Sequence, residues 1–258
     1  MQEVSQTDDK FKIKDVLKSA ADIVKNNLQF IIILAIIWMG IPSLLGTYAG
    51  TIGSEASLSQ DPNRINDANR VIGLMGITTS LWGIVIAPGI YRILLKLIDN
   101  EKASYTELIP NDLPLLLRVA GASILLSIAI ALGLVFLILP GIFLGIKFQF
   151  TLWLIIDKQY RVFDALKKSW EMTDGLISKF FILFFALLGV YVVAAIASGI
   201  ILIPLNIIGE FLNITIFLKG IVKSLVSGCF FTFAFLVIGL IYKKSELSPT
   251  TKHETLEP

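Results

Sequence analysis

The feature that most constrains the fold is a set of long windows without a charged side chain. Four of them cover residues 26–54, 71–91, 180–209 and 224–242. An ionised side chain at the middle of a bilayer costs roughly 2.5–3.5 kcal/mol on insertion scales, and a helix that spans the hydrocarbon core needs about 20 residues. Each window is long enough and apolar enough to predict one membrane-spanning helix.

A fifth window, residues 119–156, carries a single charge at Lys147 and is too long for one span. Leu139-Pro140-Gly141 divides this window, because proline and glycine together favour a break or a sharp turn. The pattern predicts a hairpin of two spans, 119–139 and 141–156, of which the second is short. The chain is therefore expected to contain six spanning helices.

Basic residues are distributed unequally over the segments between the spans. Of the 22 Lys and Arg residues, 17 fall on the side that holds both termini and four on the opposite side, and Lys147 is the remaining one. Such an excess marks the cytoplasmic side of a membrane protein. The sequence predicts cytoplasmic N- and C-termini and three hairpins that each run from the cytoplasm outward and back.

Two cytoplasmic segments, one in the N-terminal arm and one at about 160–174, have the spacing of amphipathic helices. The apolar residues that share a face are Ile13, Leu17, Ala20 and Val24 in the first segment and Phe163, Leu166 and Trp170 in the second. Such helices lie in the plane of the membrane surface with lysines toward anionic headgroups, so anionic lipid at the cytoplasmic face is the expected partner. Packing against neighbouring loops is the alternative.

The predicted fold class is all-α: a polytopic membrane helix bundle of six transmembrane helices, arranged as three in–out–in hairpins, plus two amphipathic interface helices. The expected organisation is a cytoplasmic arm (1–27), a six-helix transmembrane domain (28–243) and a disordered cytoplasmic tail (244–258). Residues 50–69 are expected to form a flexible extracytoplasmic loop, in which Asp61-Pro62-Asn63 starts a turn.

A shift of 149 residues aligns the two amphipathic segments. It pairs Asp15-Val16-Leu17-Lys18 with Asp164-Ala165-Leu166-Lys167, and Ile33-Leu34 with Ile182-Leu183. Both copies begin on the cytoplasmic side, so a duplication would be a parallel repeat about an axis along the membrane normal. Chance similarity between apolar segments is the alternative.

The scarcity of particular side chains argues against most kinds of enzyme chemistry. Charged residues make up 16% of the chain, against about 25% in typical soluble domains, and the net charge of +2 gives no indication of nucleic acid. Cys229 and His253 are the only residues of their types, which excludes intramolecular disulfides, histidine triads and multi-cysteine metal sites. A local ion pair explains Glu210, Lys219 and Lys223. No catalytic residue, metal ligand or cofactor is assigned.

Lys147 is the charged residue inside a predicted span. It lies ten residues before Asp157, which places its backbone about 15 Å from the cytoplasmic end of the helix. An ionisable group at that depth indicates a polar cavity, to which Gln149 and Thr151 would add hydrogen-bonding groups. The alternative is structural: the lysine extends to the nearer headgroups or bonds within the bundle.

A set of turn and cap residues runs from the predicted hairpin turn through the second amphipathic segment. It comprises Ile138-Leu139-Pro140-Gly141-Ile142, Lys147-Phe148, Ala165-Leu166-Lys167-Lys168-Ser169-Trp170 and Gly175, and it is preceded by Gly89-Ile90-Tyr91. Over about residues 85–245 the chain resembles the membrane domain of glycerophosphoryl diester phosphodiesterases and related stand-alone membrane proteins. The structural motif residues of this resemblance are Pro140, Gly141, Ser169 and Gly175.

The resemblance implies a multi-pass protein of a prokaryotic plasma (inner) membrane. It brings no catalytic residue, because phosphodiesterase activity in that family belongs to a separate soluble domain. The leading hypothesis is a non-enzymatic envelope accessory or scaffold protein. A small-solute or lipid transporter with a site near Lys147 is the alternative, and a lipid-acting enzyme is the third. Another membrane protein or a second copy of this chain is a further candidate partner.

Overall fold

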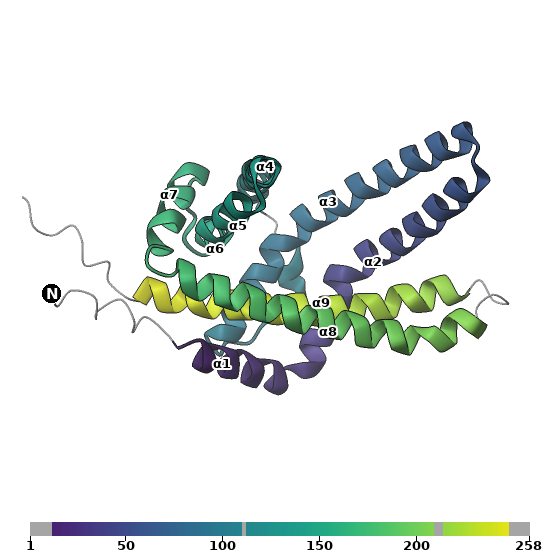
Figure 1. Ribbon diagram of the computed structural model, residues 1–258. Helices are drawn as coiled ribbons and strands as arrows, with labels where there is room; N and C mark the ends of the chain where they lie inside the picture. The colour runs from purple at the N-terminus through teal and green to yellow at the C-terminus, as the bar shows by residue number, and fades with distance from the viewer. Residues whose placement is uncertain (1–11, 110–111, 209–213, 248–258) are drawn as a thin grey trace, which may run out of the picture.

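The computed structural model describes residues 12–109, 112–208 and 214–247, and all regular structure within these ranges is helical (Figure 1). The elements are, in chain order, α1 (Ile13–Asn26), α2 (Leu28–Ser59), α3 (Pro62–Ile98), the short 3-10 helix η1 (Tyr105–Leu108), α4 (Leu113–Phe136), α5 (Ile138–Lys147), α6 (Thr151–Lys158), α7 (Val162–Met172), α8 (Ile177–Ile208) and α9 (Ile214–Leu247). Six spans among the described residues are long and apolar enough to cross a membrane, counting α5 and α6 as one. The predicted all-α polytopic bundle is confirmed.

The first hairpin, α2–α3, is longer than the sequence predicts. Residues 50–69 are helical except at Gln60 and Asp61, so the prediction of a flexible loop is wrong. The Asp61 carboxylate accepts a hydrogen bond from the Asn63 N–H at 2.9 Å, and Pro62 is the first residue of α3. Aspartate and proline favour these two positions of a helix, so a pattern taken as the start of a loop turn begins a helix instead.

The second hairpin turns earlier than predicted. Leu137 has an extended backbone (φ −165°, ψ 147°) between α4 and α5, so the turn precedes Pro140 rather than falling on it. Pro140 lies in the first turn of α5. Backbone N–H groups in the first turn have no acceptor within the helix, so the N–H that proline lacks removes no helix hydrogen bond there. Gly141 allows α5 to touch α4, since a Cβ placed on Gly141 would lie only 2.9 Å from the backbone nitrogen of Leu134.

The fourth span is broken. Residues 148–150 form a turn between α5 and α6, whereas the sequence contains no proline or glycine at that point to predict a break. The two short helices together with α4 and α7 form one group in Figure 1, beside the long pair α8–α9.

A chain of aromatic contacts connects four helices in the core. The Tyr91 ring lies 4.6 Å from that of Trp153 and 5.4 Å from that of Phe235. Trp153 in turn stacks on Tyr242, and Phe235 meets Trp38 edge to face. These contacts join α2, α3, α6 and α9, and Trp153 and Tyr242 are almost completely buried. The core therefore connects all three hairpins through side chains rather than through short loops.

The two predicted amphipathic helices are present as α1 and α7. They begin 149 residues apart, as do α2 and α8, in agreement with the shift that aligns the sequence. Val16 and Ala20 are the buried residues of α1, and the same shift relates them to Ala165 and Ser169, which are buried in α7. Residues 1–11 of the predicted arm and 248–258 of the predicted tail lie outside the described residues, and α9 continues to Leu247.

Candidate functional site

Lys147 is bonded inside the protein. Only 3% of its side chain is exposed, and its Nζ forms an ion pair with Oδ1 of Asp174, just after α7. Nζ also donates a hydrogen bond to the Trp170 carbonyl at 3.4 Å and lies 4.8 Å from the centroid of the Trp170 ring. A cation on an aromatic face and against a carboxylate is stabilised by both. The ammonium group is thus bound by residues 170–174.

Two hydroxyl groups, of Ser169 in α7 and of Thr173 just after it, replace helix hydrogen bonds at the break. Ser169 Oγ donates to the Lys147 carbonyl at 2.8 Å and accepts from the Phe150 N–H at 3.2 Å. Thr173 Oγ1 lies 3.5 Å from the same carbonyl and bonds more closely to carbonyls of its own helix. Since an unpaired buried backbone group costs about 1–3 kcal/mol, these bonds offset much of the cost of the break.

The segment after α7 needs a glycine. Gly175 has φ 74°, a left-handed conformation that side chains with a Cβ rarely adopt. The chain turns there from α7 into α8, and the Leu176 N–H donates to the Thr173 carbonyl at 3.1 Å. We call Lys147, Ser169, Thr173, Asp174 and Gly175 the α7 clasp, because together they hold α7 and the turn that follows it against the broken span.

The other two candidate polar residues do not join the α7 clasp. Gln149 Nε2 and Thr151 Oγ1 are buried, and neither atom has a hydrogen-bond partner among the described residues. Thr151 begins α6, and its side chain has no exposed surface. The structure therefore places Lys147, Gln149 and Thr151 within one turn of each other but gives them different surroundings. Pro140 and Gly141 lie at the opposite end of α5.

A second group of charges lies at the ends of three spans. Tyr242 OH donates to Asp157 Oδ2 at 2.9 Å, and Lys243 Nζ lies 2.9 Å from Asp99 Oδ2. Lys158 pairs with Glu246 at 2.6 Å. These contacts tie the ends of α3, α6 and α9 together at one level, which we call the end layer.

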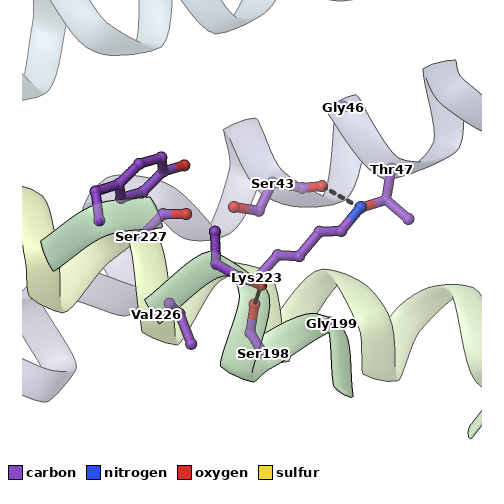
Figure 2. A pocket seen from close by; sticks show the side chains of 10 residues that line it. Ser43, Gly46, Thr47, Ser198, Gly199, Lys223, Val226 and Ser227 are labelled. Atoms are coloured by element: carbon purple, nitrogen blue, oxygen red, sulfur yellow. Dashed lines mark hydrogen bonds between the residues drawn. The ribbon is translucent and has the colours of Figure 1, made fainter. Parts of the chain in front are cut away.

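A pocket of about 380 Å³ lies between α2, α8 and α9 (Figure 2), and its lining shares no residue with the α7 clasp. Its lining residues are Ser43, Gly46 and Thr47 of α2, Tyr191, Ala195, Ser198 and Gly199 of α8, and Lys223, Val226 and Ser227 of α9. Sequence reasoning missed this pocket because its polar groups come from three distant segments. The spacing of hydroxyl groups in the sequence could have indicated the pocket. Ser43 and Thr47 are four residues apart, and Tyr191 and Ser198 are seven apart. Each pair therefore shares one face of its helix.

The Lys223 side chain is exposed, and no described residue forms an ion pair with it. Glu210, its predicted local partner, and the side chain of Lys219 lie outside the described residues. No group of three or more His, Cys, Asp or Glu that could hold a metal ion occurs in the described part of the chain.

Comparison with known proteins shows a distant similarity to a bacterial membrane protein. A UPF0259 membrane protein of Pectobacterium carotovorum subsp. carotovorum (strain PC1) is 28% identical over 101 residues, which are 39% of this chain and 40% of the relative. The match thus spans less than half of either protein, and it indicates similarity to an uncharacterised bacterial membrane protein. No family model matches the chain, and no solved structure matches it. The resemblance to the membrane domain of glycerophosphoryl diester phosphodiesterases rests on its motif residues alone.

Proposed function

We propose that this membrane protein is a non-enzymatic accessory or scaffold bundle of a prokaryotic plasma membrane, with both termini in the cytoplasm. The distribution of basic residues supports the orientation, and similarity to a bacterial membrane protein supports the location. We also infer a relationship to the membrane domain of glycerophosphoryl diester phosphodiesterases. Its motif residues Gly141, Ser169 and Gly175 have structural roles here, in the α4–α5 contact and in the α7 clasp.

The main support for the scaffold proposal is the way in which the Lys147 side chain is bound within the protein. Its ammonium group is buried and contacts the Asp174 carboxylate, the Trp170 carbonyl and the Trp170 ring. A transport site must release its charged groups to the solute in each cycle. A lysine that holds α7 to the broken span instead serves the shape of the bundle, which is what a scaffold requires.

The test is to replace the ion pair by a neutral pair and to measure abundance and function separately. Lys147→Met/Asp174→Asn removes both charges with little change in the size of either side chain. A strain lacking the gene and carrying this variant is expected to match the wild type in protein level and in growth under envelope stress. The matched control removes an exposed ion pair, Arg70→Gln/Asp67→Asn, whose side chains are 73% and 75% exposed. Normal abundance with lost complementation would contradict the proposal.

A transporter with its site beside Lys147 is the second candidate. Gln149 Nε2 and Thr151 Oγ1, which have no partner among the described residues, favour it, because buried polar groups usually have partners. Thr151→Val and Gln149→Leu remove these groups with little change of shape. The transporter proposal expects each variant to accumulate normally and to fail in complementation, whereas the scaffold proposal expects normal growth.

The amphipathic helices are proposed to contact anionic lipid at the cytoplasmic face. On α7, Phe163 is 75% exposed and Trp170 38% exposed, on a helix that also carries Lys167 and Lys168. Aromatic side chains beside lysines are typical of helices in the membrane interface. Hydrogen exchange of α7 is expected to be slower in nanodiscs with phosphatidylglycerol than in purely zwitterionic ones. Equal exchange in both would contradict this contact.

A further inference from the structure

The pocket between α2, α8 and α9 lies about one bilayer thickness away from the end layer. Lys223 and Lys243 are 20 residues apart on the continuous helix α9, so at 1.5 Å per residue their backbones are about 30 Å apart. The hydrocarbon core of a bilayer is also about 30 Å thick. With Lys243 at one headgroup boundary, Lys223 lies at the other, which is the depth of the lipid phosphates in the opposite leaflet.

The groups that line the pocket suit an anion. Thr47 Oγ1 donates to the Ser43 carbonyl and Ser198 Oγ donates to the Ala195 carbonyl, both at 2.8 Å, so these two hydroxyl hydrogens are used within their own helices. No described residue accepts a hydrogen bond from the hydroxyl groups of Ser43, Tyr191 or Ser227. Among the described residues, three hydroxyl donors and one ammonium group of the lining therefore have no partner, and no carboxylate lines the pocket.

The Lys223 side chain extends across the pocket in the direction of Thr47 rather than out along its own helix (Figure 2). Because α2 and α9 pack along each other, an anion in the pocket would meet donors from both helices and from α8. Hydrogen bonds from an ammonium group to a phosphate oxygen are charge-assisted and stronger than neutral ones.

The surface beside the pocket is apolar and faces outward. On α8, the residues next to the lining side chains are Val192, Val193, Ile196 and Ile200, which are 47% to 68% exposed. The pocket volume of about 380 Å³ is at the lower end of the range for small-ligand sites and is too small for acyl chains in addition to a headgroup. A ligand with an anionic head in the pocket and hydrocarbon chains along α8 fits both surfaces.

We propose that this pocket binds the phosphate group of an anionic phospholipid from the leaflet opposite the end layer. Lys223 supplies the charge, and Ser43, Tyr191 and Ser227 supply hydroxyl donors. The site is separate from the α7 clasp, so it does not depend on the scaffold proposal. A free phosphate ion offers the same head chemistry without the chains, and the experiment must distinguish the two.

The experiment is native mass spectrometry of the full-length protein in detergent, titrated with phosphatidylglycerol or with phosphatidylcholine of the same chain length. The wild type is expected to prefer phosphatidylglycerol, and Lys223→Ala is expected to weaken that binding about tenfold, the loss of one charge-assisted bond. Lys223→Arg is expected to restore it. Arg70→Ala removes an exposed base of α3 that is outside the pocket and serves as the matched control, with binding expected to match the wild type.

Two further variants distinguish lipid binding in the pocket from a general effect of charge on lipid binding. Ala195→Phe fills the pocket without altering charge and is expected to reduce lipid binding as Lys223→Ala does, with monodisperse elution showing that it folds. Glu210→Gln is expected to have no effect. If the wild type binds no phosphatidylglycerol and Glu210→Gln does bind it, Glu210 neutralises Lys223 in the wild type. That result would overturn the proposal.

The last part of the experiment is competition by inorganic phosphate and by glycerol phosphate. Both are expected to compete with phosphatidylglycerol only at millimolar concentration, because they lack the chains that contact α8. Competition by inorganic phosphate at the lipid's own concentration would overturn the assignment to a phospholipid. Equal loss of binding in Lys223→Ala and Arg70→Ala would overturn the site itself.

Discussion

Lys147 and Asp174 form an ion pair in which the two partners have very different surroundings: the lysine side chain is 3% exposed and the aspartate side chain 65%. A hydrated carboxylate tolerates the loss of its partner, whereas a buried ammonium group does not. The two members of the pair therefore differ in what their removal costs in stability.

Asp174→Ala is expected to destabilise the protein more than Lys147→Met. The first change leaves the buried charge with only the Trp170 carbonyl and the aromatic rings, at a cost of about 1–3 kcal/mol. The second leaves an exposed carboxylate and a side chain of similar size. Thermal unfolding in detergent compares them, and a lower melting temperature for Lys147→Met than for Asp174→Ala would refute the asymmetry.

Ser169→Ala is expected to destabilise the α7 clasp by about 1–3 kcal/mol, because the Phe150 N–H loses its acceptor and the Lys147 carbonyl loses its closest donor. The control is Ser57→Ala, since Ser57 Oγ is exposed and bonds only to the Gly53 carbonyl of its own helix. Hydrogen exchange at residues 148–152 is expected to rise in Ser169→Ala alone. Unchanged exchange there would show that Ser169 does not stabilise the break.

Tyr242→Phe tests the link between the aromatic core and the end layer. The variant keeps the ring stacked on Trp153 but loses the hydrogen bond to Asp157, so the expected loss is about 1 kcal/mol. Trp153→Ala removes the ring itself and is expected to cost about 3–5 kcal/mol. Chemical unfolding measures both, and equal losses would mean that the ring contacts contribute little.

Gly175→Ala is expected to destabilise the protein by about 1 kcal/mol or more, because its φ of 74° is strained for any residue with a Cβ. Gly145→Ala is the matched control. A Cβ at Gly145 meets nothing within 4 Å, and alanine favours the helix, so its melting temperature should be equal or higher. Equal melting temperatures for the two variants would contradict a left-handed requirement at Gly175.

Membrane orientation is tested with single cysteines in a Cys229→Ala background. Leu58, at the tip of the α2–α3 hairpin, and Glu101, after α3, are both exposed and lie at opposite ends of that helix. In intact cells a membrane-impermeant maleimide is expected to label Leu58→Cys and to label Glu101→Cys only after lysis. The reverse pattern would place the termini outside.

The spans were predictable because their signal, an absence of charge, is local in the sequence. The break in the fourth span was not, since the hydroxyl group that bonds to its backbone belongs to Ser169, which follows Lys147 by 22 residues. Asp174, the partner of Lys147, is likewise 27 residues away, at the end of a segment whose spacing predicts an amphipathic helix but not this contact. The prediction for residues 50–69 is wrong because a polar composition is compatible with a helix as well as with a loop, and helix α3 begins at Pro62.

The different surroundings of two tryptophans have an optical consequence. Trp153 is 1% exposed and in contact with Tyr91 and Tyr242, whereas Trp170 is 38% exposed on α7 beside Lys147. Quenchers attached to lipid acyl chains act only on an indole that they can touch. In a Trp38→Phe/Trp82→Phe background, which leaves only these two of the four tryptophans, the emission of Trp170 should therefore report how deeply α7 enters the bilayer, while Trp153 supplies an internal reference intensity in the same molecule.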